Sequence, residues 1–350
     1  MVTVDVRNPN PQEWEELIPN MQRCIDAGLQ TFQGGEDLGV FRNLRSDTPQ
    51  SILDHCNLIV PIRVPENMTN PVRTTEKMIL QTAQAVGGDS LDTVQLNYNA
   101  ESPYHMDMLE VLDRMQRDGV VRSITGRGMP PELLREAHEN HFGIDSNQIS
   151  LNLLDPEGRH YKTEMLVASR DTDTPLVMEH ALAGGWLTDR FVGRLQDEPP
   201  DHDLTFREYL FKPQLQAWQR RIRERSLRQN KQPWVYYQQN MMDVLKDMAL
   251  KHQVSVSTIA LRWALQLDQA TSVVAGWELG KHHLDFMNQV WALRQVFELE
   301  LDEEDMERLW EVSGCYPPSG DLPKLDWQAL EEQQEIAHGI FRTKKDTTYL

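Results

Sequence analysis

The residues that could do chemistry first come together in the stretch DAGLQTFQGGEDLG, residues 26–39. A helix is expected to end at Gly28, a short apolar strand to end at Gln33, and a loop with Glu36 and Asp37 to follow. In a barrel of alternating strands and helices, catalytic side chains lie where a strand ends and its loop begins. Two carboxylates at that place are candidates for proton transfer. The uncharged Gln33 beside them is therefore unexpected.

A second pair of candidates, Tyr104 and His105, follows a later predicted strand in the segment ESPYHMDM. Both side chains would lie on the same face as the first loop and could contact a ligand. The alternative is an ordinary helix start, with Ser102 as the N-cap and Pro103 at the first helical position. We favour the helix start.

The sequence gives no sign of a metal site. His282 and His283 are adjacent, so one helix face cannot direct both at the same ion, and no set of His, Cys and Glu has zinc spacing. The three cysteines, Cys24, Cys56 and Cys315, are an odd and sparse set that is typical of a reducing compartment. We therefore expect a cytoplasmic location, with a plastid or mitochondrion as the alternative if Met1 is not the native start.

Composition excludes several classes of partner. The 350 residues include 35 basic and 54 acidic side chains, which gives a formal net charge of −19. A surface of that charge repels phosphate backbones, so no nucleic-acid partner is expected. The sequence contains no apolar run of about 18 residues, so no membrane span is expected either.

Strands and helices alternate along the chain. Strands are predicted at residues 2–6, 29–33, 57–64, 91–98, 120–125, 147–153, 175–180 and 271–276, and helices at 12–27, 71–86, 104–119, 130–141, 235–253, 255–266 and 299–313. About eight strand–helix units in a chain of this size favour a closed parallel barrel. The predicted fold class is thus α/β: a (β/α)8 TIM barrel over residues 1–316, with a long insertion after strand 7 at residues 189–234 and a C-terminal extension at 317–350.

Five segments, in order along the chain, resemble the aldo/keto reductase family. They are LDTVQLNY, LEVLDRMQRDGVVRSIT, GIDSNQISLNLLD, LAGGWLTDRF, and LKDMALKHQVSVSTIALRWALQ with the following TSVVAG. Each match alone is weak, but five in the right order are specific. The resemblance implies a TIM barrel that binds NADPH across its C-terminal face and reduces aldehydes and ketones without a metal.

The catalytic residues that the resemblance implies are all replaced in this chain. The family's Asp position falls on Gln33, its proton-donating Tyr on Leu38, its Lys on Arg63 and its His on Asn97. Leu38 has no proton to give, Gln33 carries no charge to pair with a Lys, and Arg63 cannot readily release a proton. Asn97 can still donate a hydrogen bond to a carbonyl, but it cannot titrate. Its neighbour Tyr98 is expected to point away from the barrel interior.

The cofactor positions that the resemblance implies are only partly kept. Gln148 matches the carboxamide-binding Gln, the loop Leu182, Ala183, Gly184 and Gly185 matches the pyrophosphate loop, and Gly276 and Lys281 match the adenosine-phosphate segment. The family's Ser–Asn pair is replaced by Arg127 and Gly128, and its nicotinamide-stacking Tyr maps near Glu179. The cofactor thus stays unknown from the sequence, with NADPH as the candidate.

Two segments could reach a protein partner. The Arg-rich stretch at residues 220–231 lies between Trp218 and Trp234, which would act as aromatic anchors of a docking element. Its plainer interpretation is a solvated helix that pairs with acids of the same chain. The extension at 317–350 carries further apolar anchors, namely Trp327, Leu330, Ile336 and Phe341.

Three functions remain open at this point. The first, which we favour, is a barrel that has lost catalysis and serves as a structural or regulatory subunit of a larger assembly. The second is an NAD(P)H-dependent oxidoreductase that acts on a carbonyl substrate with non-standard residues, such as Glu36, Asp37 or Glu179 as the proton donor. The third is a sensor that binds a nucleotide without turning it over.

Overall fold

The computed structural model describes residues 2–5, 14–35, 38–48, 50–155, 163–194, 198–225, 232–276 and 293–314. Several sequence predictions fall outside these ranges. They concern Glu36, Asp37, Lys281, the pair His282 and His283, Cys315, part of the Arg-rich stretch, and the extension at 317–350 with its apolar residues Trp327, Leu330, Ile336 and Phe341.

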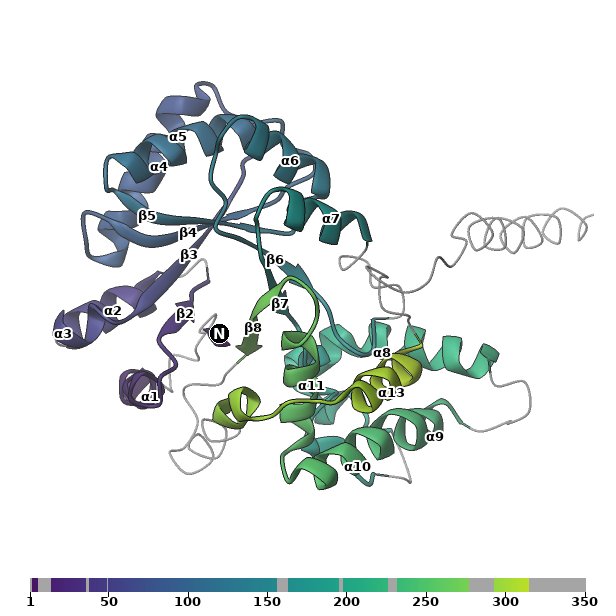
Figure 1. Cartoon of the computed structure of the whole chain (residues 1–350). Helices are drawn as coiled ribbons and strands as arrows, with labels where there is room; N and C mark the ends of the chain where they lie inside the picture. The colour runs from purple at the N-terminus through teal and green to yellow at the C-terminus, as the bar shows by residue number, and fades with distance from the viewer. Residues whose placement is uncertain are drawn as a thin grey trace, which may run out of the picture. The chain divides into compact units, whose positions relative to one another are not determined.

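The strands form one parallel, curled sheet in which neighbours in the sequence are neighbours in space (Figure 1). They are β1 (Val2–Asp5), β2 (Thr31–Gln33), β3 (Asn57–Arg63), β4 (Leu91–Asn97), β5 (Val121–Arg127), β6 (Ser146–Ser150), β7 (Leu176–Glu179) and β8 (Ala270–Gly276). Pairing of β1 with β8 closes the sheet into a barrel. The prediction of a parallel, barrel-like sheet with alternating helices is confirmed.

Helices follow the strands and cover the outside of the sheet. They are α1 (Trp14–Asp26), α2 (Gly39–Asp47), α3 (Gln50–Leu53), α4 (Pro71–Val86), α5 (His105–Arg117), α6 (Pro131–Glu139), α7 (Thr163–Asp171), α8 (Phe206–Arg225), α9 (Pro233–Tyr236), α10 (Asp243–His252), α11 (Val256–Leu265) and α13 (Glu303–Ser313). In Figure 1 helices α4 to α7 lie around the outer side of β3 to β6.

Several element boundaries differ from the sequence prediction, including those of one long helix and of strand β5. The single helix expected at residues 235–253 is divided by a π-helical turn at Tyr237–Met242, between α9 and α10. Strand β5 continues two residues beyond the predicted end, to Arg127, because the ladder to β4 runs on to the pair Asn97 and Arg127. This longer strand decides the position of Arg127 in the site.

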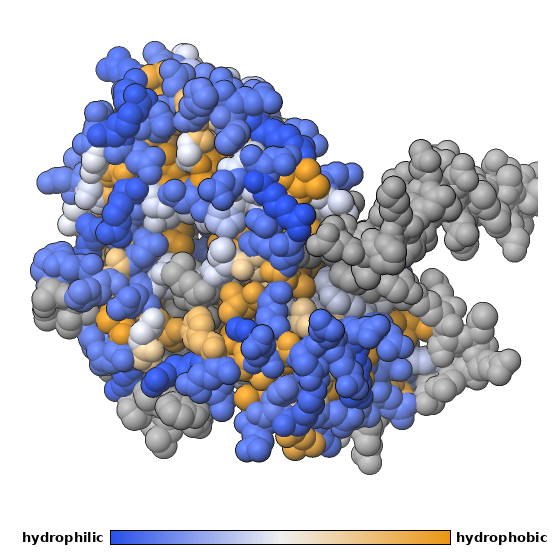
Figure 2. Space-filling view, in the orientation of Figure 1, coloured by the Kyte–Doolittle hydropathy of each residue, from blue (hydrophilic) through white to orange (hydrophobic). Residues whose placement is uncertain are grey.

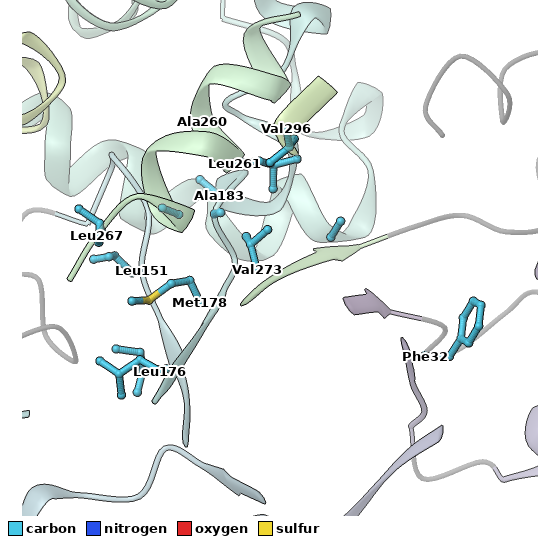
Figure 3. Close-up of a cluster of buried hydrophobic side chains, with 14 of the residues drawn as sticks. Phe32, Leu151, Leu176, Met178, Ala183, Ala260, Leu261, Leu267, Val273 and Val296 are labelled. Atoms are coloured by element: carbon cyan, nitrogen blue, oxygen red, sulfur yellow. The ribbon is translucent and has the colours of Figure 1, made fainter. Parts of the chain in front are cut away.

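The hydrophobic core lies between the sheet and its helices. Alternate strand residues point outward and are apolar and buried, among them Phe32, Val60, Ile62, Val94, Leu96, Ile124, Met178 and Val273. Figure 3 shows Met178 of β7 and Val273 of β8 in the same cluster as Ala260 and Leu261 of α11. The opposite face of the strands lines the interior of the barrel, which we call the lumen.

An aromatic cluster holds the segment after β7 against the rest of the barrel. Its members, Trp186, Phe191, Trp218, Trp234 and Tyr237, are all buried, and the rings of Trp186 and Phe191 stack with centroids 4.6 Å apart. The indole of Trp218 donates to Val312 O at 3.2 Å, and that of Trp234 donates to Arg194 O at 2.7 Å. The expectation that Trp218 and Trp234 are exposed anchors for a partner is therefore wrong, because the large rings bury their area within this chain.

The surface that Figure 2 shows is mainly hydrophilic, in keeping with the acidic composition. None of the helices in the described ranges has both the length and the apolar character needed to cross a bilayer.

Candidate functional site

The carboxyl ends of the strands carry a connected set of polar side chains, and it begins at Gln33. Gln33 Nε2 donates to Gln95 Oε1 at 2.9 Å, and Gln95 Nε2 donates to Gln148 Oε1 at 2.8 Å. Gln148 Nε2 in turn donates to Glu179 Oε2 at 2.6 Å. The chain of amides thus ends on a carboxylate, which Arg127 binds from another side.

These contacts run through the lumen. Gln33, Gln95 and Gln148 belong to β2, β4 and β6, which are not neighbours in the sheet. Side chains of alternate strands meet only across the barrel interior, where such residues form layers. All three amides are buried. The lumen is therefore polar at this level, whereas bulky aliphatic residues usually fill a TIM barrel.

Glu179 is the best-connected residue of this set. Its side chain is 8% exposed, and it receives Nε of Arg127 at 3.1 Å and an end nitrogen of the same guanidinium at 2.8 Å. Nδ1 of His180 lies 3.7 Å from its other oxygen. Burial raises the pKa of Glu179, but His180, Arg127 and the hydrogen bond from Gln148 together hold it below its usual value. Glu179 is therefore an ionised partner rather than a proton donor at neutral pH.

Because the pKa of Glu179 is lowered in the folded protein, part of the free energy of unfolding depends on pH. Because the pKa is lower in the folded than in the unfolded chain, this carboxylate contributes its full stabilisation above the ordinary glutamate pKa of about 4.3 and loses it as the pH falls through the folded-state value. We expect the free energy of unfolding in urea to fall on acidification, and Glu179→Gln to lack that part of the fall. Equal acid dependence in the two proteins would contradict the assignment.

His180 joins the site from the loop after β7. Its Nδ1 lies 3.0 Å from Ser150 Oγ, and its ring packs on Phe211 of α8 with centroids 4.9 Å apart. The backbone of His180 has a φ of 63°, a left-handed conformation that is rare for a residue other than glycine. Sequence reasoning missed His180, and it missed Gln95 although that residue lies two positions before Asn97 on the same strand face.

The four family positions of catalysis are not brought together as a set. Gln33 points into the lumen, whereas the side chain of Arg63 is 69% exposed and lies 3.7 Å from Glu66. Leu38 packs at the edge of the hydrophobic core. Asn97 holds its amide oxygen buried, and that oxygen has no hydrogen-bond partner among the described residues. Gln33 and Arg63 thus do not form the charged pair that the family has at the ends of these two strands.

Two of the predicted cofactor positions, Gln148 and the loop after β7, already have hydrogen-bond partners within the chain. Both the oxygen and the nitrogen of the Gln148 amide are bound, to Gln95 and to Glu179. In the loop after β7, Ala183 N donates to His180 O at 2.7 Å, and Gly185 N donates to Leu182 O at 2.9 Å. These two backbone groups therefore already have partners. Gly276 ends β8.

Helix α8 packs directly on this loop at Gly184. A Cβ atom on Gly184 would lie 2.7 Å from both Arg207 O and the Phe211 ring, and the φ of Gly184 is 69°. We expect Gly184→Ala to lower the free energy of unfolding by about 2–4 kcal/mol, because backbone strain and steric conflict add together. Urea denaturation would measure this loss.

Gly28 provides the matched control for this substitution. Its φ is 86°, but a Cβ atom there meets nothing within 4 Å. Gly28→Ala should therefore cost only the backbone strain of about 1 kcal/mol. Equal losses for the two variants would mean that α8 does not press on the loop.

Tyr104 and His105 take part in a helix start, as favoured from the sequence, although the start lies later than predicted. Tyr104 is the N-cap residue of α5, and Ser102 instead donates its hydroxyl to Pro65 O. His105 is buried, accepts a hydrogen bond from Asn99 N at 3.2 Å and stacks on Tyr98 at 4.8 Å. Burial lowers the pKa of His105. Both residues thus support the loop after β4.

The described ranges contain no cluster of His, Cys, Asp and Glu able to hold a metal.

Comparison with known proteins agrees with the barrel fold. The sequence profile of the Aldo/keto reductase family matches residues 56–313. The crystal structure of a thermostable aldo-keto reductase in complex with the inhibitor epalrestat is similar in fold, with a TM-score of 0.61 at 14% identity, over 89% of this chain and 94% of that one. No curated protein matches the sequence significantly.

Proposed function

This chain belongs to the aldo/keto reductase family, and we propose that it is a member without carbonyl reductase activity that serves as a structural or regulatory subunit of a larger assembly. The observation that carries the proposal is the ion pair of Arg127 and Glu179. The resemblance maps Arg127 onto the family's Ser–Asn pair in the cofactor site and places the nicotinamide-stacking Tyr near Glu179, and here these two residues bind each other. The amide of Gln148, which would bind the carboxamide, is held between Gln95 and Glu179.

The positions of catalysis support the same proposal. Proton donation to a carbonyl needs a titratable group whose pKa is adjusted by its neighbours. Leu38 cannot titrate, and the exposed Arg63 lies beside Glu66 rather than beside Gln33. Among the residues that the structure describes at the ends of β2 and β3, none combines a titratable proton donor with a buried cation, as the family mechanism requires.

Titration with NADPH and NADH, followed by quenching of tryptophan fluorescence, tests the proposal. Trp186, Trp218 and Trp234 lie in the aromatic cluster beside the loop after β7, so binding there should change their emission. We expect no saturable change up to about millimolar dinucleotide, a concentration that would detect binding as weak as about −4 kcal/mol. Steady consumption of NADPH with any member of a panel of aldehydes would contradict the proposal.

A second candidate function is an NAD(P)H-dependent oxidoreductase with non-standard residues, and His180 is the observation that favours it. Histidine is the side chain that titrates most readily near neutral pH. His180 lies at the carboxyl end of β7, and its Nδ1 is 3.0 Å from Ser150 Oγ and 3.7 Å from a carboxylate oxygen of Glu179. A histidine in that place could replace the missing tyrosine. Saturable NADPH binding with turnover that His180→Gln abolishes would favour this candidate over the first.

We propose that residues 1–316 form the barrel, that residues 189–234 are an insertion after β7, and that residues 317–350 are an extension. We also propose that the insertion binds a protein partner. Since Trp218 and Trp234 are buried, the proposed docking element of the insertion is the outer face of α8, where Tyr209 is 54% and Leu210 is 55% exposed. A stoichiometric partner in native purification should be lost from Tyr209→Ser with Leu210→Ser.

A further inference from the structure

A pocket opens at the amino ends of the strands, on the side of the barrel opposite to Glu179 and the amides. It lies between the loop that joins α6 to β6 and the loop that joins α7 to β7. The helices α6 and α7 lie side by side on the outside of the sheet (Figure 1). We call it the α6–α7 pocket. Its volume of about 450 Å³ is within the range of small-molecule sites.

Part of the wall of the α6–α7 pocket is apolar. Its apolar residues are Leu134 and Ile144, which are buried, and Phe142 and Pro175, which are half-buried. Leu134 belongs to α6, and the other three belong to the two loops. A ligand with a hydrocarbon part can therefore remove apolar surface from water here.

Two carboxylates, Asp145 and Asp173, complete the wall from different loops, and both residues are exposed. One oxygen of Asp145 accepts from Ser123 Oγ at 2.6 Å and from Ile124 N at 3.0 Å, which fixes this side chain and uses only one of its two oxygens. Among the described residues, none forms a hydrogen bond or ion pair with the side chain of Asp173. The described wall contains no Lys or Arg, so neither charge is neutralised within the pocket.

Gly143 shows that the α6–α7 pocket has unfilled space. This residue belongs to the wall, and a Cβ atom added to it would have no heavy atom within 4 Å. Its φ is not among the positive values of the described chain, so a side chain at this position causes no backbone strain. A large side chain there is therefore a means of reducing the space without changing any charge.

The chemistry of the wall selects the ligand. Two unneutralised carboxylates beside an apolar surface favour an organic cation that carries alkyl groups, and the ring of Phe142 adds to the attraction. An inorganic cation is disfavoured, because the described residues provide no group of three or more ligands for it. Because the two carboxylates each carry one negative charge, they match a ligand with two ammonium groups.

We propose that the α6–α7 pocket binds an aliphatic diamine of about the size of putrescine. One ammonium group donates to Asp173 and the other to the free oxygen of Asp145, and the methylene groups lie against Phe142 and Leu134. The inference goes beyond the proposed function and does not depend on it, because the pocket and the cofactor positions lie at opposite ends of the strands.

Isothermal titration calorimetry of the full chain with putrescine tests the site. We expect saturable binding of one equivalent, and we expect Asp173→Asn to weaken it about tenfold, the equivalent of one charge-assisted hydrogen bond. Asparagine tolerates the φ of 51° at this position as well as aspartate does. Asp171→Asn is the matched control, because Asp171 is an exposed acid of the same segment that does not line the pocket. Its affinity for putrescine should equal that of the unmodified protein.

A steric variant and two further ligands separate space from charge. Gly143→Leu keeps every charge and should weaken putrescine binding at least tenfold, because its side chain occupies the pocket. Butylamine, with one ammonium group, should bind about tenfold more weakly than putrescine, and the uncharged 1,4-butanediol should give no saturable heat.

Three results would overturn the site. They are the absence of saturable putrescine binding, binding of 1,4-butanediol as tight as that of putrescine, and equal affinities in Asp173→Asn and Asp171→Asn. The last result would assign the binding to the acidic surface in general. The NADPH titration is read separately, because dinucleotide binding would refute only the proposed function and loss of putrescine binding would refute only this inference.

Discussion

Arg127→Ala is expected to lower the free energy of unfolding by about 3–5 kcal/mol, because it leaves the buried carboxylate of Glu179 without its guanidinium. The remaining hydrogen bond from Gln148 and the ring of His180 do not replace two charge-assisted bonds. Urea denaturation at neutral pH measures the loss directly. The same variant should unfold with less difference between neutral and acidic pH than the unmodified protein.

Two further variants separate the effect of losing the ion pair from the effect of shortening the side chain. Arg127→Met combined with Glu179→Gln removes both charges at similar volume, and it should recover most of the loss. Arg170→Ala is the surface control, because Arg170 pairs with Asp268 at a site where both side chains are nearly half exposed. That change should cost less than about 1 kcal/mol. Equal effects of Arg127→Ala and Arg170→Ala would mean that the pair at the barrel mouth is no stronger than a surface pair.

Carbonyl reduction should return only when the catalytic positions and the ion pair are both changed. The variant Gln33→Asp, Leu38→Tyr, Arg63→Lys and Asn97→His replaces all four family positions. We expect it to stay inactive and not to bind NADPH, because Arg127 and Glu179 still fill the mouth and Gln148 is still engaged. Adding Arg127→Ser and Glu179→Tyr should give saturable NADPH binding and measurable reduction of aldehydes.

The control for this series is the five-fold variant that has the same substitutions except Leu38→Tyr. It should bind NADPH as tightly as the six-fold variant but reduce aldehydes about 10²–10⁴ times more slowly, the usual contribution of a positioned acid. Absorbance of NADPH reports the rate, and tryptophan emission reports the binding. NADPH binding by the four-fold variant would show that the ion pair does not block the cofactor.

The sequence predicted the sheet, the order of its strands and the end of β2 at Gln33, because strand patterns and turn residues are local signals. It also identified Gln148 as a kept cofactor position and Arg127 and Glu179 as altered ones. It did not predict that they bind one another, since that depends on which strands face each other across a closed barrel. The prediction that Trp218 and Trp234 bind a protein partner was wrong for a related reason. The residues next to a tryptophan in the sequence do not show whether its ring packs within the same chain or against another protein.

The fixed orientation of the lumen amides also makes the chain difficult to change one residue at a time. With Gln148 and Gln95 held by Glu179, the group that Gln95 presents to position 33 is an oxygen. The single substitution Gln33→Asp would place a carboxylate beside that oxygen. Two hydrogen-bond acceptors would then face each other, so this substitution alone should lower the free energy of unfolding. The effects of these substitutions are therefore expected to be epistatic. If the chain lacks reductase activity, as proposed, a series of single substitutions that introduces it must first separate Glu179 from Gln148.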